Sequence, residues 1–167
     1  VGLVASEYAQ WLRTSVFGTA GRPYKHRHLH ALDGIVPCSS REGAAFVYGA
    51  ACCLGGARLH MLLNSLSNDF ISASFALLGE RGCFEEIGKR GVWSAARMAA
   101  AGGPAYDAVA LDSEMAADPR WMQGVLGVLS TRAGHGSVHG LPLHSFDLAR
   151  QWEAAFRLLQ GGGNVGK

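Results

Sequence analysis

The sequence predicts an α/β fold with a doubly wound parallel sheet and helices on both of its faces. Short β-branched and aromatic runs alternate along the chain with helical patterns of about ten residues, the order that right-handed βαβ units produce. Turns rich in glycine and polar residues follow the apolar runs, where a parallel sheet presents its ligand-binding edge. The 167 residues correspond to about one domain.

The first third of the chain alternates regularly between the two patterns. Helices are expected over residues 4–12, 24–32 and 42–54, and strands over residues 15–19 and 35–38. Pro23 suits the first turn of the second helix, where its missing N–H has no cost. Ser39 and Ser40 are expected to cap the third helix. The fold therefore opens on a helix and not on a strand.

The rest of the chain continues the alternation. Strands are expected over residues 58–63, 82–87 and 106–111, and helices over residues 70–78, 120–132 and 147–159. Asn68 with Asp69, and Asp118 with Pro119, are the expected helix starts. Residues 94–104 and 133–141 are rich in glycine with alanine or histidine, and both are expected to be loops.

Composition excludes several classes of protein. Apolar residues make up 49% and charged residues 17%, which excludes a disordered chain. A net charge of +2 gives no reason to expect nucleic acid as a partner, and no apolar run reaches the ~18–20 residues of a membrane span. The four cysteines lack C-x-x-C spacing, and the adjacent Cys52 and Cys53 are expected to be reduced and buried. These features favour a cytoplasmic protein.

The candidate ligand contacts are the residues at the carboxyl ends of the predicted strands. They are Thr19, Gly21, Ser40, Arg41, Asn64, Ser65, Gly88, Lys89, Asp112 and Ser113. Several loops that meet at one edge of a parallel sheet suit a polar ligand. Ordinary turn chemistry explains the same residue types, so the pattern alone leaves both interpretations open.

Two segments carry a resemblance to a known family. Residues 64–74 (NSLSNDFISAS) and 82–91 (GCFEEIGKRG) resemble the NADPH-binding half of the enoyl reductase domains of polyketide synthases and animal-type fatty acid synthases. These domains belong to the quinone-oxidoreductase-like branch of the medium-chain dehydrogenases/reductases. Residues 1–10, 19–25 and 154–167 also resemble successive family segments, so the resemblance runs along the whole chain.

The resemblance implies a Rossmann-type domain that binds NADPH. The residues it implies for cofactor binding are Gly2, Thr19, Lys25, Ser40, Arg41, Asn64, Ser65, Gly88, Gly166 and Lys167. No Asp or Glu occurs from Val16 to His30, where an NAD site places its acid, whereas Arg22, Lys25, His26 and Arg27 lie there and suit a 2′-phosphate. A solvated basic helix face is the alternative for these cations.

Lys89 and Asp112 follow successive predicted strands and are the candidate catalytic residues. The resemblance implies that they assist protonation when an enoyl thioester on acyl carrier protein is reduced by NADPH. A structural salt bridge is the alternative. No metal site is expected, because His26, His28 and His30 do not share one helix face and no carboxylate joins them.

The departures from the family bear on the expected domain. The family's first strand and its substrate-binding half have no counterpart here, so residues 1–167 are expected to be an NADPH-binding subdomain from a longer chain. The expected partners are the carrier-bound enoyl substrate and the other synthase domains, namely the substrate-binding half, ketoreductase and dehydratase. A stand-alone quinone or enone oxidoreductase, or an inactive structural remnant of a reductase, are the alternatives.

Overall fold

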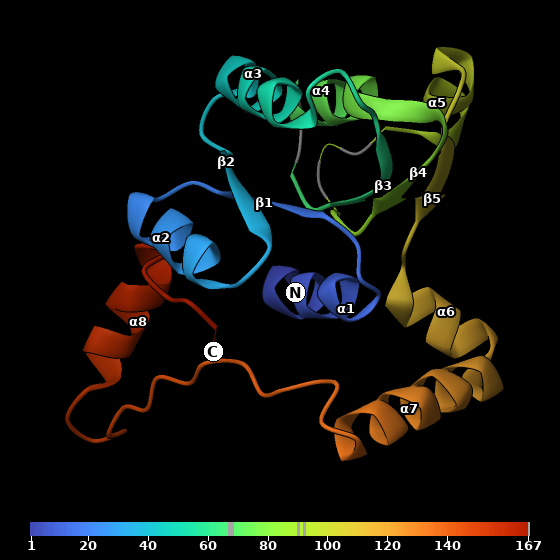
Figure 1. Ribbon diagram of the computed structural model, residues 1–167. Helices are drawn as coiled ribbons and strands as arrows, with labels where there is room; N and C mark the ends of the chain where they lie inside the picture. Colours follow the sequence, from blue (N-terminus) through green and yellow to red (C-terminus); the bar gives the residue numbers. More distant parts are fainter. Residues whose placement is uncertain (67–68, 90, 92, 167) are drawn as a thin grey trace.

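A computed structural model describes residues 1–66, 69–89, 91 and 93–166 and confirms the α/β class (Figure 1). The helices are α1 (Gly2–Trp11), α2 (Pro23–Ala31), α3 (Gly43–Leu54), α4 (Asp69–Leu77), α5 (Ala95–Ala101), α6 (Leu111–Ala117), α7 (Pro119–Gly134) and α8 (Trp152–Gln160). The strands are β1 (Val16–Ala20), β2 (Ile35–Ser39), β3 (Leu59–Asn64), β4 (Leu78–Glu86) and β5 (Ala105–Ala108).

All strand pairs are parallel, as predicted, but the strands form two sheets and not one. One sheet has the order β1-β2 and the other the order β3-β4-β5. Within the described ranges β1 bonds only to β2, and β3 only to β4, so the edges of β1 and β3 are not joined to each other. In each sheet the carboxyl ends of the strands lie on one side, as parallel pairing requires.

The core has two parts beside the two sheets. Cys38, Phe46, Ala50 and Leu77 form the first cluster, where α3 and α4 lie side by side (Figure 1). Ile71, Leu78, Phe84 and Met98 form the second cluster, between α4, β4 and α5. Phe84 is fully buried and packs against the rings of Phe75 and Tyr106. The two clusters meet at α4, which contributes to both.

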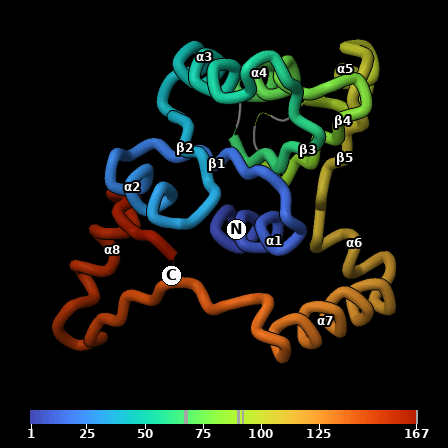
Figure 2. The backbone as a smooth tube through the Cα atoms, viewed as in Figure 1, coloured from blue at the N-terminus to red at the C-terminus, as the bar shows by residue number. Residues whose placement is uncertain are grey.

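Helices α6, α7 and α8 have no buried residue and extend along one side of the molecule (Figure 2). The chain between α7 and α8 crosses below α1, and α8 lies beside α2. Tyr24 links α2 to the segment that follows α8, because its hydroxyl donates to the Gly162 carbonyl at 2.6 Å. Arg132 of α7 stacks over the rings of Tyr8 and Trp11 and so ties α7 to α1.

Some of the expected element boundaries are wrong. Residues 94–104 contain α5, which begins because the Ser94 hydroxyl accepts a hydrogen bond from the Arg97 N–H at 3.2 Å. The last helix begins at Trp152, because residues 147–151 form a turn closed by the Gln151 N–H and the Asp147 carbonyl. Strand β4 begins earlier than expected, at Leu78, and β5 ends earlier, at Ala108.

Two local predictions near α3 are also wrong. Ser39 and Ser40 do not cap the helix: β2 continues to Ser39, whose hydroxyl accepts from the Arg41 N–H at 3.3 Å. Cys52 and Cys53 are exposed and not buried: Cys52 lies on the side of α3 away from the buried Phe46 and Ala50, and Cys53 lies in the last turn, beyond Ala50. The predicted start at Asn68 lies outside the described residues. No helix of the described chain combines the length and apolarity needed to cross a membrane.

Candidate functional site

Lys89 and Asp112 meet, as the sequence predicts, beyond the carboxyl ends of β4 and β5. Lys89 lies three residues after β4, and Asp112 lies in the first turn of α6. The Lys89 Nζ atom donates to Asp112 Oδ2 at 3.0 Å, with the two side chains 73% and 69% exposed. Both groups are therefore in reach of a ligand at this edge.

The ion pair fixes the charge on Asp112. The hydrogen bond from Lys89, and then its positive charge, hold the pKa of the Asp112 carboxyl below its ordinary value. Asp112 is therefore ionised at neutral pH and accepts hydrogen bonds only. Of the two residues, Lys89 is the one that carries a proton to donate.

A buried polar network lies behind this pair. Asn64 ends β3, Glu86 ends β4, and the two residues are register partners. Asn64 Nδ2 donates to Glu86 Oε2 at 2.6 Å, and the Gly88 N–H donates to Glu86 Oε1 at 2.6 Å. Asn64 also forms a turn with Leu66, in which Nδ2 donates to the Leu66 carbonyl and Oδ1 accepts from the Leu66 N–H. Asn64 and Glu86 are each only 2% exposed.

Glu86 was not among the candidate site residues, although the sequence held a signal for it. Gly82, Phe84 and Glu86 are buried and alternate along β4 with the half-buried Cys83 and Glu85. Strand periodicity places every second side chain on one face, so the buried position of Phe84 also assigns Glu86 to the core. Burial, followed by the negative charge of Glu86, raises the pKa of the neighbouring Tyr106 hydroxyl.

The ends of β1 and β2 form a second group of predicted residues. The Arg41 guanidinium donates through Nε to the Gly21 carbonyl, and the Ser40 N–H donates to the Ala20 carbonyl at 3.1 Å. A Cβ atom at Gly21 would lie 2.8 Å from Arg41 Nε, so glycine is needed there for the guanidinium to cross. Arg41 thus lies over the end of β1, and within the described part of the chain its two terminal nitrogens make no hydrogen bond.

Helix α2 begins shortly after β1 and carries Lys25 in its first turn. Lys25 is half-buried, and its Nζ atom lies 6.0 Å from the centre of the Tyr24 ring. His26 Nε2 is 2.5 Å from the Ala20 carbonyl, which can only accept, so this nitrogen carries the proton. His26 therefore holds α2 onto the end of β1, whereas no hydrogen bond or ion pair of the Lys25 side chain is found among the described residues.

The positions of the remaining predicted residues say little about a role in ligand binding. Gly2 begins α1, where a Cβ atom would meet nothing within 4 Å. Thr19 is exposed near the end of β1, and Ser65 is exposed in the turn after β3. A Cβ atom at Gly166 would lie 2.1 Å from the Pro142 carbonyl oxygen, so packing already accounts for that glycine. The predicted Lys167 lies outside the described residues.

Two groups of predicted residues thus form, one at each sheet. Lys25, Ser40 and Arg41 surround the end of β1, and Asn64, Ser65, Gly88, Lys89 and Asp112 surround the ends of β3 and β4. None of the hydrogen bonds or ion pairs found for the described residues joins the two groups. The described chain holds no cluster of three or more histidine, cysteine or acidic residues that suits a metal ion.

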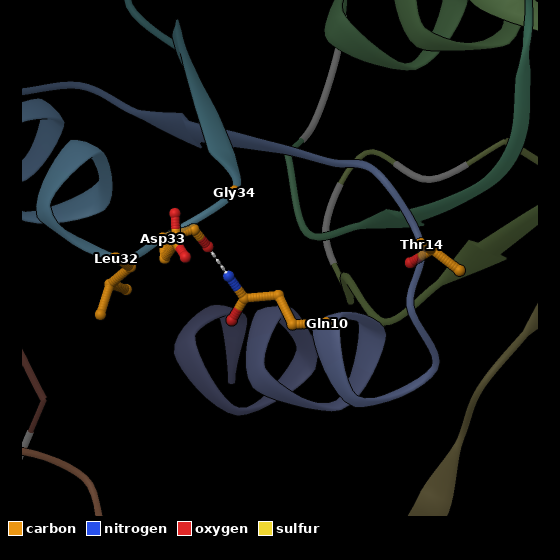
Figure 3. Close-up of a pocket in the computed structure, with 5 residues that line it drawn as sticks. All are labelled: Gln10, Thr14, Leu32, Asp33 and Gly34. Carbon is orange, nitrogen blue, oxygen red and sulfur yellow. Dashed lines mark hydrogen bonds between the residues drawn. The ribbon is translucent and has the colours of Figure 1, made fainter.

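An open hollow lies at the opposite ends of β1 and β2 (Figure 3). It is lined by Gln10, Thr14, Leu32, Asp33 and Gly34, and Gln10 reaches across it to the Asp33 carbonyl. Thr14 and Gly34 precede β1 and β2, so this hollow lies at the amino ends of the strands. It is therefore separate from the predicted ligand-binding edge.

The chain is similar in sequence to segments of large polyketide synthases. It is 35% identical over 170 residues to the spectinabilin polyketide synthase system protein NorB of Streptomyces orinoci, and 30% identical over 173 residues to highly-reducing polyketide synthase 1 of Aureobasidium melanogenum. Both matches cover 100% of this chain, and the chain spans only 7% and 8% of those proteins. No protein-family model matches the chain.

Solved structures with the same fold include enoyl reductases. The CurK enoyl reductase has a TM-score of 0.87 and 28% identity, covering 99% of this chain and 49% of that one. The nucleotide-binding subdomain of the enoylreductase domain of PpsC from Mycobacterium tuberculosis has a TM-score of 0.71 and 24% identity, covering 81% and 76%. Escherichia coli quinone oxidoreductase complexed with NADPH has a TM-score of 0.69 and 19% identity, covering 99% and 52%. By sequence and by fold, the chain belongs to the enoyl reductase domains of polyketide synthases, and its fold matches the nucleotide-binding subdomain of one of them.

Proposed function

We propose that this chain is the NADPH-binding part of an enoyl reductase that reduces a trans-2-enoyl thioester carried on acyl carrier protein. The observation that carries the proposal is the Lys89–Asp112 pair, with an Nζ–Oδ2 distance of 3.0 Å, at the edge where a parallel sheet binds its ligands. The enoyl reductase family supports the reaction type, and the other domains of the same synthase are the proposed partners.

The residues at the ends of β1 and β2 fit a phosphorylated nicotinamide cofactor. Lys25 and Arg41 supply positive charge there, and Asp33, the one carboxylate between residues 16 and 41, lies at the other end of β2. A 2′-phosphate suits this arrangement, whereas the ribose hydroxyls of NADH would lack an acidic acceptor. Lys25, Ser40 and Arg41 would hold that phosphate, with Thr19 and Gly2 nearby along the nucleotide. A protein of the same fold binds NADPH.

The second group of residues suits the reacting end of the cofactor. NADPH, when bound, supplies the hydride that the enoyl β-carbon receives. Asn64, Ser65 and Gly88 would border the nicotinamide, and Gly166 with Lys167 the far side of the cofactor. The α-carbon then needs a proton, and Lys89 Nζ is the group that can donate it, directly or through one water. Asp112, held ionised by Lys89, orients the Lys89 Nζ atom through their 3.0 Å hydrogen bond.

Cofactor discrimination tests the proposed site. The experiment is a fluorescence titration of the whole polypeptide that contains this chain with NADPH and with NADH. Lys25→Ala and Arg41→Ala should each raise the Kd for NADPH by about 10- to 100-fold, the effect of losing one charge-assisted hydrogen bond, and leave the Kd for NADH unchanged. Arg120→Ala, which removes a cation from the exposed start of α7, is the matched control. Equal affinity for both cofactors in every variant would contradict the assignment.

Turnover separates the reductase from an inactive remnant. A crotonyl thioester and NADPH should both be consumed by the same polypeptide, in equal amounts. A polypeptide that binds NADPH tightly and never consumes it would be a structural remnant that has kept its cofactor site. A free quinone consumed faster than any thioester would instead indicate a quinone reductase.

A further inference from the structure

We propose that Glu86 is a positioning residue for the proposed reaction: its buried carboxylate joins the Asn64 turn to Gly88 and thereby sets where Lys89 lies against Asp112. This inference deepens the proposed function and depends on it for its catalytic meaning. The geometry that carries it, however, is a buried network that exists with or without the cofactor.

The donors and acceptors of the network match completely. Glu86 offers two oxygens, and each accepts one hydrogen bond of 2.6 Å, from Asn64 Nδ2 and from the Gly88 N–H. Asn64 donates its second amide hydrogen to the Leu66 carbonyl at 2.6 Å and accepts from the Leu66 N–H at 3.3 Å. Because Leu66 contacts both ends of the amide, Asn64 cannot rotate to suit a different partner without losing both of these bonds.

A carboxylate at this depth needs a reason beyond stability. An apolar side chain of similar size generally stabilises a core as well as a buried charged group does. Glu86 does what an apolar residue cannot: it holds donors from two different loops at one point. One loop carries Ser65, and the other carries Lys89, the residue directly after Gly88. Fixing the Gly88 N–H therefore fixes where the chain leaves β4 and where the Lys89 side chain starts.

The pKa of the Asp112 carboxyl reports this positioning without any turnover. Lys89 lowers it, so a displaced Lys89 lets it rise towards its ordinary value. The experiment is carboxyl NMR titration of the whole polypeptide without cofactor. Lys89→Met defines the full upward shift, and Glu86→Gln should give a substantial part of it. Glu85→Gln is the matched control, because it removes the same charge from the adjacent residue, whose side chain contacts Cys83 and not the network.

A paired exchange tests the network directly. In Glu86→Gln, the new amide can accept from only one of its two donors, so one bond is lost. Asn64→Asp alone places two carboxylates face to face. When the two substitutions are combined, the amide introduced at position 86 donates to the carboxylate introduced at position 64, while its oxygen still accepts from the Gly88 N–H. The Leu66 carbonyl loses the donor that Asn64 supplied, in the double variant as in Asn64→Asp alone. The pKa of Asp112 should therefore be lower in the double variant than in Asn64→Asp, where the two carboxylates repel each other.

The outcomes separate this inference from the proposed function. An unchanged Asp112 pKa in a folded Glu86→Gln variant would overturn the inference, and so would a double variant no better than Asn64→Asp in folding and in the Asp112 pKa. In an active reductase, kcat should fall about 10- to 100-fold in Glu86→Gln, the effect of one lost hydrogen bond to a charged group, and should be higher in the double variant than in Asn64→Asp. If the unmodified polypeptide has no reductase activity, the proposed function fails while the Asp112 titration still decides the inference.

Discussion

Replacing Lys89 by methionine removes the ammonium group and keeps a side chain of similar length. Replacing Asp112 by asparagine removes the carboxylate charge and keeps its shape. The two groups are joined by the 3.0 Å contact between Nζ and Oδ2. The pair is the feature on which the proposed protonation step depends, so these two variants and their combination examine it most closely.

The expected effect on the rate is large and the expected effect on stability is small. A positioned general acid contributes about 10²- to 10⁴-fold to a rate, so Lys89→Met should lower kcat within that range. Because Lys89 and Asp112 are 73% and 69% exposed, neither variant leaves a charge buried without a partner. The thermal unfolding midpoint should therefore change little in either variant.

The double variant shows whether the two residues act together. If Asp112 works only by orienting Lys89, then Lys89→Met with Asp112→Asn should cost no more in kcat than Lys89→Met alone. The assay is steady-state oxidation of NADPH with a crotonyl thioester. Arg157→Met is the matched control, because it breaks an equally exposed ion pair, to Glu153 at 3.2 Å on α8, away from the site. The reasoning would be refuted if the two substitutions lowered kcat independently, so that their effects multiplied in the double variant. It would also be refuted if neither substitution changed kcat.

The pH dependence of this pair follows from the pKa of Asp112. In the folded protein, Lys89 holds that pKa below the value of the unfolded chain. The contribution of the pair to stability is therefore present above the unfolded pKa and is lost as the pH falls through the lowered, folded pKa. Carboxyl NMR should show Asp112 titrating below its ordinary pKa, and Lys89→Met should raise it. A titration at the ordinary pKa in the unmodified protein would show that the contact is not formed.

Three further predictions concern packing, capping and thiol chemistry. Phe84→Ala should destabilise the β4 region by about 3–5 kcal/mol, because the ring is fully buried, and faster amide hydrogen exchange in β4 measures it. Asp118→Ala removes both 3.0 Å N-cap bonds of α7 and should cost about 0.5–2 kcal/mol, seen as faster exchange in its first turn, whereas Asp118→Ser should keep most of the cap. A hydrogen bond to Glu85 raises the pKa of Cys83 to about 11, so its thiol stays protonated below that pH. Iodoacetamide should therefore modify the exposed Cys52 before Cys83. Preferential modification of Cys83 would contradict this prediction.

The sequence predicted the helices and strands best where periodicity and caps agreed. Helix α7 was expected from Asp118 and Pro119, and the side chain of Asp118 does cap it. Helix α5 was missed because the glycines at 102–103 suggested a loop, although Ser94 is a good cap and residues 95–101 favour helix. The two-sheet arrangement depends on which strand edges meet in space, and no local pattern in the sequence determines that.

The candidate site was likewise predicted only in part. The contact between Lys89 and Asp112 was foreseen, because parallel strands place their carboxyl ends on one side. Glu86 was missed because two adjacent glutamates both suggest a solvated position, and only the burial of Phe84 on the same face indicates which of them turns inward. The bond from His26 to the Ala20 carbonyl was also missed, since it depends on how closely α2 approaches the end of β1.

The most direct test of the proposed reaction follows where the two hydrogens in the product come from. The whole polypeptide is given a crotonyl thioester and NADPH deuterated at nicotinamide C4, and in a second experiment unlabelled NADPH in heavy water. Mass spectrometry and NMR of the butyryl product should show cofactor deuterium at the β-carbon and solvent deuterium at the α-carbon. NADPH is labelled on one face of C4 or on the other in separate experiments. If neither label reaches the product, or if no product forms, a reductase that uses this site is contradicted.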